Sequence, residues 1–207
     1  NNVGVLLDDL SLTSEGFEAS YATNLLNHWV LTEALIAGDA LAASGTVIEM
    51  ASGGMYNAPL TLDYMGIKDP RRYSGVYAYA VHKRGQAELV KYWQYLHGAR
   101  DLRFYVMHPG WADTDGVKTS LPNFQRRLRL VLRNSAQGAD TALWLAATRP
   151  KQPGPEAFWF DRAPRPAHAL VHTSVSKHSP ADLADFLRKE AASVAPASRE
   201  SLRSIRA

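Results

Sequence analysis

Thr46-Val47-Ile48-Glu49-Met50-Ala51 is a short, mostly apolar run that ends at the loop Ser52-Gly53-Gly54. This pattern predicts a buried β-strand. Leu102-Arg103-Phe104-Tyr105-Val106-Met107 predicts a second strand, which stops at His108-Pro109-Gly110. Between them, apolar residues at helical spacing predict a long helix over residues 76–96. Strands separated by a long helix are typical of α/β proteins, so we expect an α/β parallel sheet.

The rest of the chain continues this alternation of helices and strands. Thr13 is a suitable N-cap for a helix that we expect to reach about residue 41. Further patterns predict helices over 137–147 and 181–190 and a strand over 156–160. Ser, Ala, Pro and Arg dominate after residue 192. We therefore expect one domain over residues 1–192 and a disordered tail over 193–207.

Length and composition exclude several classes of protein. The chain has 207 residues, of which 46% are hydrophobic and 21% charged, and it contains no cysteine. Disulfide frameworks, cysteine-ligated metals and thiol catalysis are thereby excluded. No apolar run is long enough to span a bilayer, and no signal-peptide pattern opens the chain. We expect a soluble, cytoplasmic protein.

Positive charge is concentrated in the second half of the chain, although the net charge is only +3. A basic helix is predicted over residues 123–133, and it carries Arg126, Arg127, Arg129 and Arg133. No nucleic-acid-binding motif accompanies this charge, so we expect no nucleic-acid partner. The helix is interpreted as a packed element or, from the family resemblance described below, as a substrate lid, and contact with a membrane surface is kept as an alternative.

The residues most suited to catalysis follow or flank the first strand. Ser52 lies where that strand ends, and ligands of such sheets bind at the carboxyl ends of strands. Tyr79 and Lys83 lie one helical turn apart on one face of the helix at 76–96. A nearby cation favours the phenolate and so makes tyrosine usable as an acid or base. Alone, a Tyr-x-x-x-Lys pair is a weak signal, because an amphipathic helix produces the same spacing by chance.

Five motifs in order make the signal stronger. They are Asn1-Asn2-Val3-Gly4, Asn24-Leu25-Leu26-Asn27-His28-Trp29, Val47 through Ser52, the Tyr79/Lys83 pair, and His108-Pro109-Gly110-Trp111-Ala112-Asp113-Thr114. Together they resemble the motifs of the short-chain dehydrogenase/reductase family over residues 1 to about 190. Val3, Asn27 and Ala51 depart mildly from the family pattern.

The resemblance implies a Rossmann-type, doubly wound parallel sheet. It also implies an NAD(P)-dependent oxidoreductase that interconverts a carbonyl and an alcohol by hydride transfer. It implies Tyr79 as proton donor, Lys83 as the group that lowers the Tyr79 pKa, Ser52 as the holder of the substrate oxygen, and Asn24 as support for a water beside Lys83. The cofactor-binding residues that it implies are Asn2, Gly4, Lys83, Pro109, Gly110 and Thr114. It does not say whether the cofactor is NAD or NADP.

One part of the family pattern is not found in the sequence. The Gly-rich turn that binds the cofactor pyrophosphate normally follows a first strand, and no such turn occurs here. We therefore expect these residues to be the C-terminal portion of a longer protein. A non-catalytic fragment or pseudoenzyme that serves as a binding module is the alternative reading.

The expected partners are a small carbonyl or alcohol substrate and, from the resemblance, a second copy of the chain packed through the helices at 14–41 and 76–96. No metal is predicted, because no carboxylate or cysteine accompanies the loosely spaced histidines His168, His172 and His178.

Overall fold

A four-stranded sheet organises the fold in the computed structural model, which describes residues 1–111, 132–154 and 157–204. The strand order is β1 (Thr46–Met50), β2 (Arg103–Met107), β3 (Ala157–Phe160) and β4 (Ala163–Pro166). β1 pairs parallel to β2 and β2 parallel to β3. The predicted α/β class is therefore confirmed.

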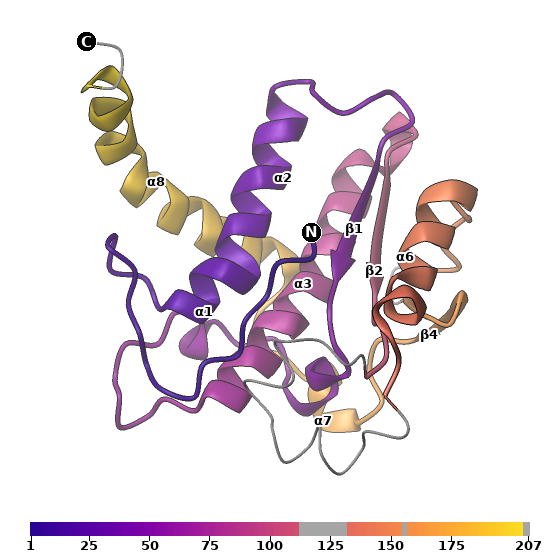
Figure 1. Cartoon of the computed structure of the whole chain (residues 1–207), viewed down its shortest axis with the longest axis horizontal. Coiled ribbons are helices and arrows are strands. Elements are labelled where there is room, and N and C mark those ends of the chain that lie inside the picture. Colours follow the sequence, from indigo (N-terminus) through magenta and orange to yellow (C-terminus); the bar gives the residue numbers. More distant parts are fainter. Residues whose placement is uncertain (112–131, 155–156, 205–207) are drawn as a thin grey trace.

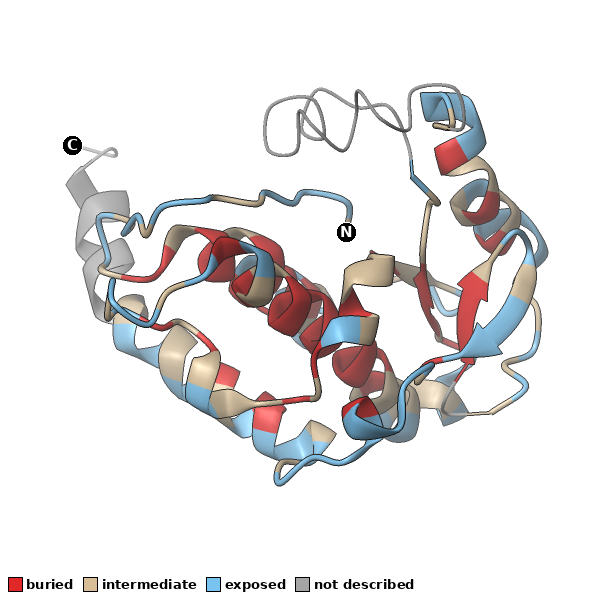
Figure 2. Cartoon of the chain, turned by 90° about the horizontal axis from the view of Figure 1, so that it is seen from below, coloured by how far each residue is buried: buried red, intermediate tan, exposed pale blue. Residues whose placement is uncertain are grey.

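Helices cover both faces of this sheet. The helices α2 (Asn27–Ala37) and α3 (Gly75–His97) lie on one side, and α6 (Ser135–Thr148) lies on the other (Figure 1). Alternate residues of β2 point to opposite faces. Phe104 and Val106 join the larger core with α3, whereas Tyr105 and Met107 pack with Leu145 of α6. Buried residues concentrate along α3 and the strands (Figure 2).

The N-terminal segment, residues 1–7, begins beside β1, where Asn1 pairs with the strand, and continues to the start of α3. The backbone nitrogen of Asn1 donates to Ile48 O at 3.0 Å, and Met50 N donates to Asn1 O at 3.0 Å. The first residues of the chain thus reach the carboxyl end of β1, where the predicted site residues lie.

The first helix begins later and ends earlier than the sequence predicts. Thr13 accepts hydrogen bonds within a turn, and Glu18 is the N-cap instead, because its carboxylate accepts from the backbone of Ser20 and Tyr21. The helix then runs through α1 (Ala19–Tyr21), the π-helical η1 (Ala22–Leu26) and α2, which ends at Ala37. A buried carboxylate offers stronger acceptors than a threonine hydroxyl, which explains the shifted start.

Three features of the second half were not predicted. β4 pairs antiparallel to β3, so the sheet is mixed and not purely parallel. A short helix α7 (Val171–Ser174) follows. The last helix, α8 (Pro180–Ser204), continues past residue 193, where the sequence predicted a tail. Leu183 and Leu187 anchor α8 in the core, and a packed helix propagates more easily than a new one forms.

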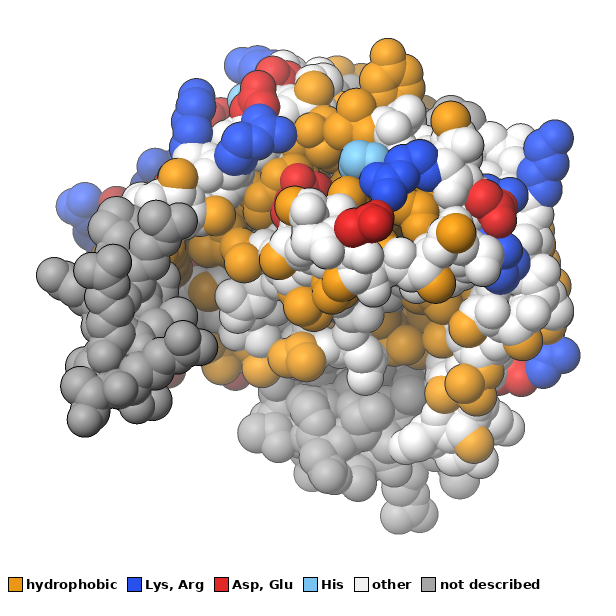
Figure 3. Space-filling view, turned by 90° about the horizontal axis from the view of Figure 1, so that it is seen from above, with side chains coloured by type: hydrophobic (Ala, Val, Ile, Leu, Met, Phe, Trp, Pro, Cys, Tyr) orange, Lys and Arg blue, Asp and Glu red, His pale blue; other side chains and the backbone are white. Residues whose placement is uncertain are grey.

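Most of the predicted basic helix over 123–133 lies outside the described residues. Arg133, at its end, is not helical; its backbone nitrogen donates to Trp111 O at 2.8 Å. On the face shown in Figure 3, Lys and Arg side chains are distributed mainly around the margin, and hydrophobic side chains gather between them. Among the described residues, no helix is long and apolar enough to cross a membrane.

His82, on α3, is buried without a hydrogen bond to either ring nitrogen among the described residues. Its Nε2 lies 3.8 Å from Oε2 of the buried Glu18. Burial, with a smaller effect from Lys83, lowers the pKa of His82 to about 3. His108 is also buried in large part, and burial followed by the Arg133 charge lowers its pKa to about 4. Both imidazoles are therefore neutral in the folded protein at neutral pH.

These two histidines predict a loss of stability in acid. Between about pH 6.5 and pH 3 these histidines bind protons in the unfolded chain but remain neutral in the folded chain. The free energy of unfolding therefore falls as pH falls. The His82 contribution is on the order of 4 kcal/mol. Urea unfolding from pH 7 to pH 4 should show a shallower decline in His82→Leu than in the wild type. The exposed control His172→Leu should keep the wild-type slope, and an identical slope in His82→Leu would contradict the assignment.

Candidate active site

Ser52, Tyr79 and Lys83 come together at the carboxyl end of β1. Ser52 lies two residues after the strand and is the N-cap of η2 (Gly53–Asn57), where its hydroxyl accepts from Gly54 N at 3.2 Å. A Cβ built on Gly54 would lie 3.5 Å from the Tyr79 ring and 3.6 Å from Ser52 Oγ. Lys83 Nζ lies 5.5 Å from the centroid of the Tyr79 ring. The three predicted groups therefore share one small region.

Lys83 is a buried cation with two oxygen partners. It is 3% exposed, and its Nζ donates to Met50 O at 2.8 Å and to Gln86 Oε1 at 3.2 Å. Burial lowers the pKa of Lys83 to about 8, and the negative charge of Glu49 opposes that shift. A buried ammonium beside a phenol ring can stabilise negative charge on that phenol more strongly than an exposed one.

The phenol of Tyr79 is in an environment that favours its protonated form. Burial raises the Tyr79 pKa above its ordinary value, and a hydrogen bond with Ser52 partly offsets the increase. Lys83 is not among the causes of this shift, so the lowering of the Tyr79 pKa that the family resemblance implies stays a prediction. A protonated phenol is the form required to donate a proton to a substrate oxygen.

Asn24 holds the N-terminal segment against the site. It is fully buried in η1; its Oδ1 accepts from Val5 N and its Nδ2 donates to Val5 O, both at 2.7 Å. A Cβ on Gly4 would lie 3.3 Å from both Asn24 Oδ1 and Lys83 Nζ. Gly4 therefore leaves open the space directly in front of Lys83. Asn2 is exposed on the same segment.

A second part of the site lies after β2. His108 accepts from Gly53 N at 3.3 Å and stacks on Phe160, with ring centroids 5.3 Å apart. Gly110 has φ +80°, a conformation that favours glycine. Pro109 and Gly110 thus lie after the strand adjacent to β1, at the same edge as Ser52. Thr114, the remaining predicted cofactor residue, is outside the described residues.

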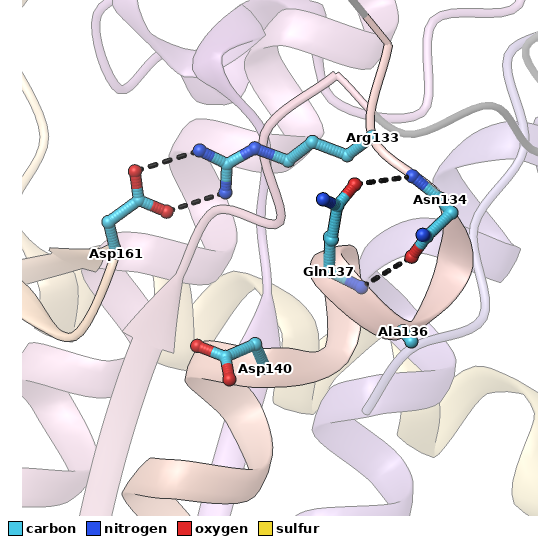
Figure 4. A pocket seen from close by; sticks show the side chains of 6 residues that line it. All are labelled: Arg133, Asn134, Ala136, Gln137, Asp140 and Asp161. Atoms are coloured by element: carbon cyan, nitrogen blue, oxygen red, sulfur yellow. Dashed lines mark hydrogen bonds and ion pairs between the residues drawn. The ribbon is translucent and has the colours of Figure 1, made fainter.

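An open pocket of about 480 Å³ lies at the start of α6 (Figure 4). The Arg133 guanidinium faces the Asp161 carboxylate, with two hydrogen bonds of 2.5 and 2.8 Å. It also lies over the Phe160 ring, and a Cβ on Gly110 would approach Arg133 Nε to 2.6 Å. The ion pair between Arg133 and Asp161 is not predicted from the sequence. The sequence does place Asp161 directly after a strand, which marks it as a residue at the ligand-binding edge of the sheet.

The described residues contain no group of three or more His, Asp or Glu side chains that could hold a metal ion. The histidines that the sequence singled out have separate partners. His168 Nδ1 is 3.2 Å from Thr173 Oγ1, and His178 Nδ1 accepts from Leu62 N at 3.4 Å.

Comparison with known proteins identifies the family to which this α/β chain belongs. No family model matches the chain. A crystal structure from Burkholderia thailandensis, described as an oxidoreductase of the short-chain dehydrogenase/reductase family, shares the fold with a TM-score of 0.51 and 19% identity over 70% of this chain and 55% of that one. The curated relative described next places the chain in the short-chain dehydrogenase/reductase family.

The relative is dehydrogenase/reductase SDR family member 12 of Bos taurus, which is 40% identical over 195 residues. The match covers 91% of this chain and 59% of that protein, so the chain spans less than two thirds of its relative's length. An uncharacterised protein from Mycobacterium paratuberculosis has a similar structure, with a TM-score of 0.61 and 22% identity over 91% of this chain and 65% of that one.

Proposed function

We propose that the whole protein is an NAD(P)-dependent oxidoreductase that interconverts a small carbonyl compound and an alcohol. The observation that carries the proposal is the convergence of Ser52, Tyr79 and Lys83 at the carboxyl end of β1, with Lys83 Nζ 5.5 Å from the Tyr79 ring centroid. Membership of a family whose relatives are named dehydrogenases or reductases supports it.

Each of these side chains has a defined task in this proposal. The Ser52 hydroxyl orients the substrate oxygen. The Tyr79 phenol donates its proton to that oxygen in reduction and removes it in oxidation. The buried Lys83 ammonium stabilises the phenolate that remains after donation, because opposite charges attract strongly where water is excluded.

The residues around Lys83 suit the nicotinamide half of the cofactor. Gly4 leaves space in front of the ammonium, and the φ of +80° at Gly110 allows close approach of the backbone at the neighbouring strand end. We propose that Asn2, Gly4, Lys83, Pro109, Gly110 and Thr114 contact the cofactor. When bound, the nicotinamide supplies or accepts the hydride.

Cofactor binding tests the proposal directly. The whole protein is titrated into NADH and, separately, into NADPH. The fluorescence of at least one of the two dinucleotides should change. Lys83→Met should weaken that binding about tenfold, because it removes a hydrogen-bond donor to the cofactor. Lys91→Met, two turns further along α3, is the control, since Lys91 forms an ion pair with Glu88 away from the site.

Turnover is then measured with a panel of aliphatic and aromatic aldehydes and ketones by loss of absorbance of the reduced nicotinamide. Absence of binding to both dinucleotides would overturn the proposal. That result would instead favour a non-catalytic family member that acts as a binding module.

A further inference from the structure

A row of buried polar side chains continues from Lys83 into the protein. Gln86 of α3, His28 of α2 and Glu49 of β1 are each 5% exposed or less. They come from three different elements and meet between the sheet and the helices. The Tyr-x-x-x-Lys pattern does not include them, and the proposed function assigns them no task.

The orientation of the Gln86 amide is chemically determined. Lys83 Nζ lies 3.2 Å from the atom assigned as Oε1, and an ammonium can only donate. The other end, Nε2, lies 2.7 Å from the backbone oxygen of Asn24, which can only accept. A flipped amide would place a donor against the ammonium and an oxygen against an oxygen. Gln86 therefore presents oxygen to Lys83.

His28 and Glu49 lie behind this amide. Nε2 of His28 lies 2.9 Å from Val3 O, so this nitrogen carries a proton. Nδ1 lies 2.8 Å from Glu49 Oε2 and 3.0 Å from Gln86 Nε2. The Asn1 side chain donates to the other oxygen of Glu49. One ring nitrogen cannot both donate to Glu49 and accept from Gln86, so the amide is fixed by the hydrogen bond from Gln86 Nε2 to Asn24 O, with the imidazole in contact beside it.

We propose that Gln86 is a positioning residue for Lys83, held by the backbone oxygen of Asn24 with its amide oxygen toward the ammonium so that the buried lysine remains charged. The inference rests on the proposed function, which requires a cation beside Tyr79. Met50 O is the other hydrogen-bond acceptor of Lys83 among the described residues, so Gln86 accepts one of the two hydrogen bonds that the ammonium makes there. Loss of one acceptor in a buried site costs more than loss of one at the surface.

Several titratable groups surround this ammonium. They are Tyr79 and His82 on α3, Glu49 on β1 and His28 on α2. Because the Lys83 pKa of about 8 is close to physiological pH, a change in a single acceptor alters the fraction of charged lysine where the protein works.

The test is an NMR titration of Lys83 in the whole protein, with lysine labelled with ¹³C at Cε. The Lys83 signal is assigned by its disappearance in Lys83→Arg. Gln86→Met keeps the side-chain length but removes the acceptor, and its Lys83 pKa should fall by about one unit. Gln86→Glu places a carboxylate at the same position, and its Lys83 pKa should rise.

Gln94→Met is the matched control, because Gln94 lies on the same helix and contacts Phe104 N instead. The Lys83 pKa should be unchanged in this control. An unchanged Lys83 pKa in a folded Gln86→Met overturns the proposal. Should that variant fail to fold, an unchanged or lower pKa in Gln86→Glu overturns it. Because the titration needs no substrate or cofactor, absence of turnover in the wild type would refute the proposed function separately.

Discussion

Tyr79→Phe is expected to lower kcat/KM of the whole protein by about 10³-fold at neutral pH, with either direction of the reaction as the assay. The substitution removes only the hydroxyl that would transfer the proton. Binding of the reduced dinucleotide should change little, because the ring and its packing against Gly54 are retained. Steady-state kinetics of the purified variant measure the effect.

Tyr77→Phe is the matched control. Tyr77 lies on the same helix, but its ring packs edge-on against Tyr64 with centroids 4.8 Å apart, away from Lys83. Its kcat/KM should remain within about twofold of the wild type. Turnover of Tyr79→Phe equal to that of Tyr77→Phe would show that the phenol does not transfer the proton.

Gly75→Ala is expected to have the largest effect on stability, about 3 kcal/mol. A Cβ on Gly75 would lie 1.9 Å from the carbonyl oxygen of Leu7 and 2.8 Å from its carbon. Tyr73 also donates to that oxygen at 3.0 Å, so the backbone of Leu7 is held in place. The extra methyl group therefore has to displace either the start of α3 or residues 1–7. Urea unfolding of the variant measures the cost.

Gly154→Ala is the control for this prediction, since a Cβ there meets no atom within 4 Å. It should change the free energy of unfolding by less than about 0.5 kcal/mol. Equal stability of the two variants would mean that residues 1–7 do not pack on α3 in solution. That result would also contradict the placement of Gly4 and Val5 beside Asn24, because both residues belong to this segment.

Residues 1–7 connect these predictions to the site. Through Val5 they satisfy the Asn24 side chain, and through Val3 they hold His28. Displacement of this segment in Gly75→Ala should therefore affect cofactor binding as well as stability. Tyr79→Phe should affect turnover alone. The two variants therefore distinguish residues that hold the site in place from the residue that transfers the proton.

The elements that position the catalytic candidates could be predicted from the sequence. The apolar runs at β1 and β2 and the helical spacing of α3 are local patterns, and the strand–helix–strand order implies a parallel pair. The position of Ser52 at a strand end follows from the same patterns. The spacing of Tyr79 and Lys83 within one helix also needs no tertiary information.

Other features depend on contacts between residues far apart in the chain. Thr13 was a reasonable N-cap, but a buried Glu18 took that role. Arg133 and Asp161 are separated by 28 residues, and although the sequence places Asp161 after a strand, it does not indicate that Arg133 is its partner. The antiparallel pairing of β4 with β3 likewise depends on how the chain turns after Phe160.

The sequence by itself determined the α/β architecture and the helix that carries Tyr79 and Lys83, because these follow from periodicity within single elements. Only the tertiary structure decided the surroundings of Lys83. Gln86, His28 and Glu49 come from a helix, a second helix and a strand, and each is an ordinary polar residue in its local sequence. Because these side chains are buried, their hydrogen bonds affect the charge state of Lys83. A charge removed from water is stabilised only by the few polar groups within reach.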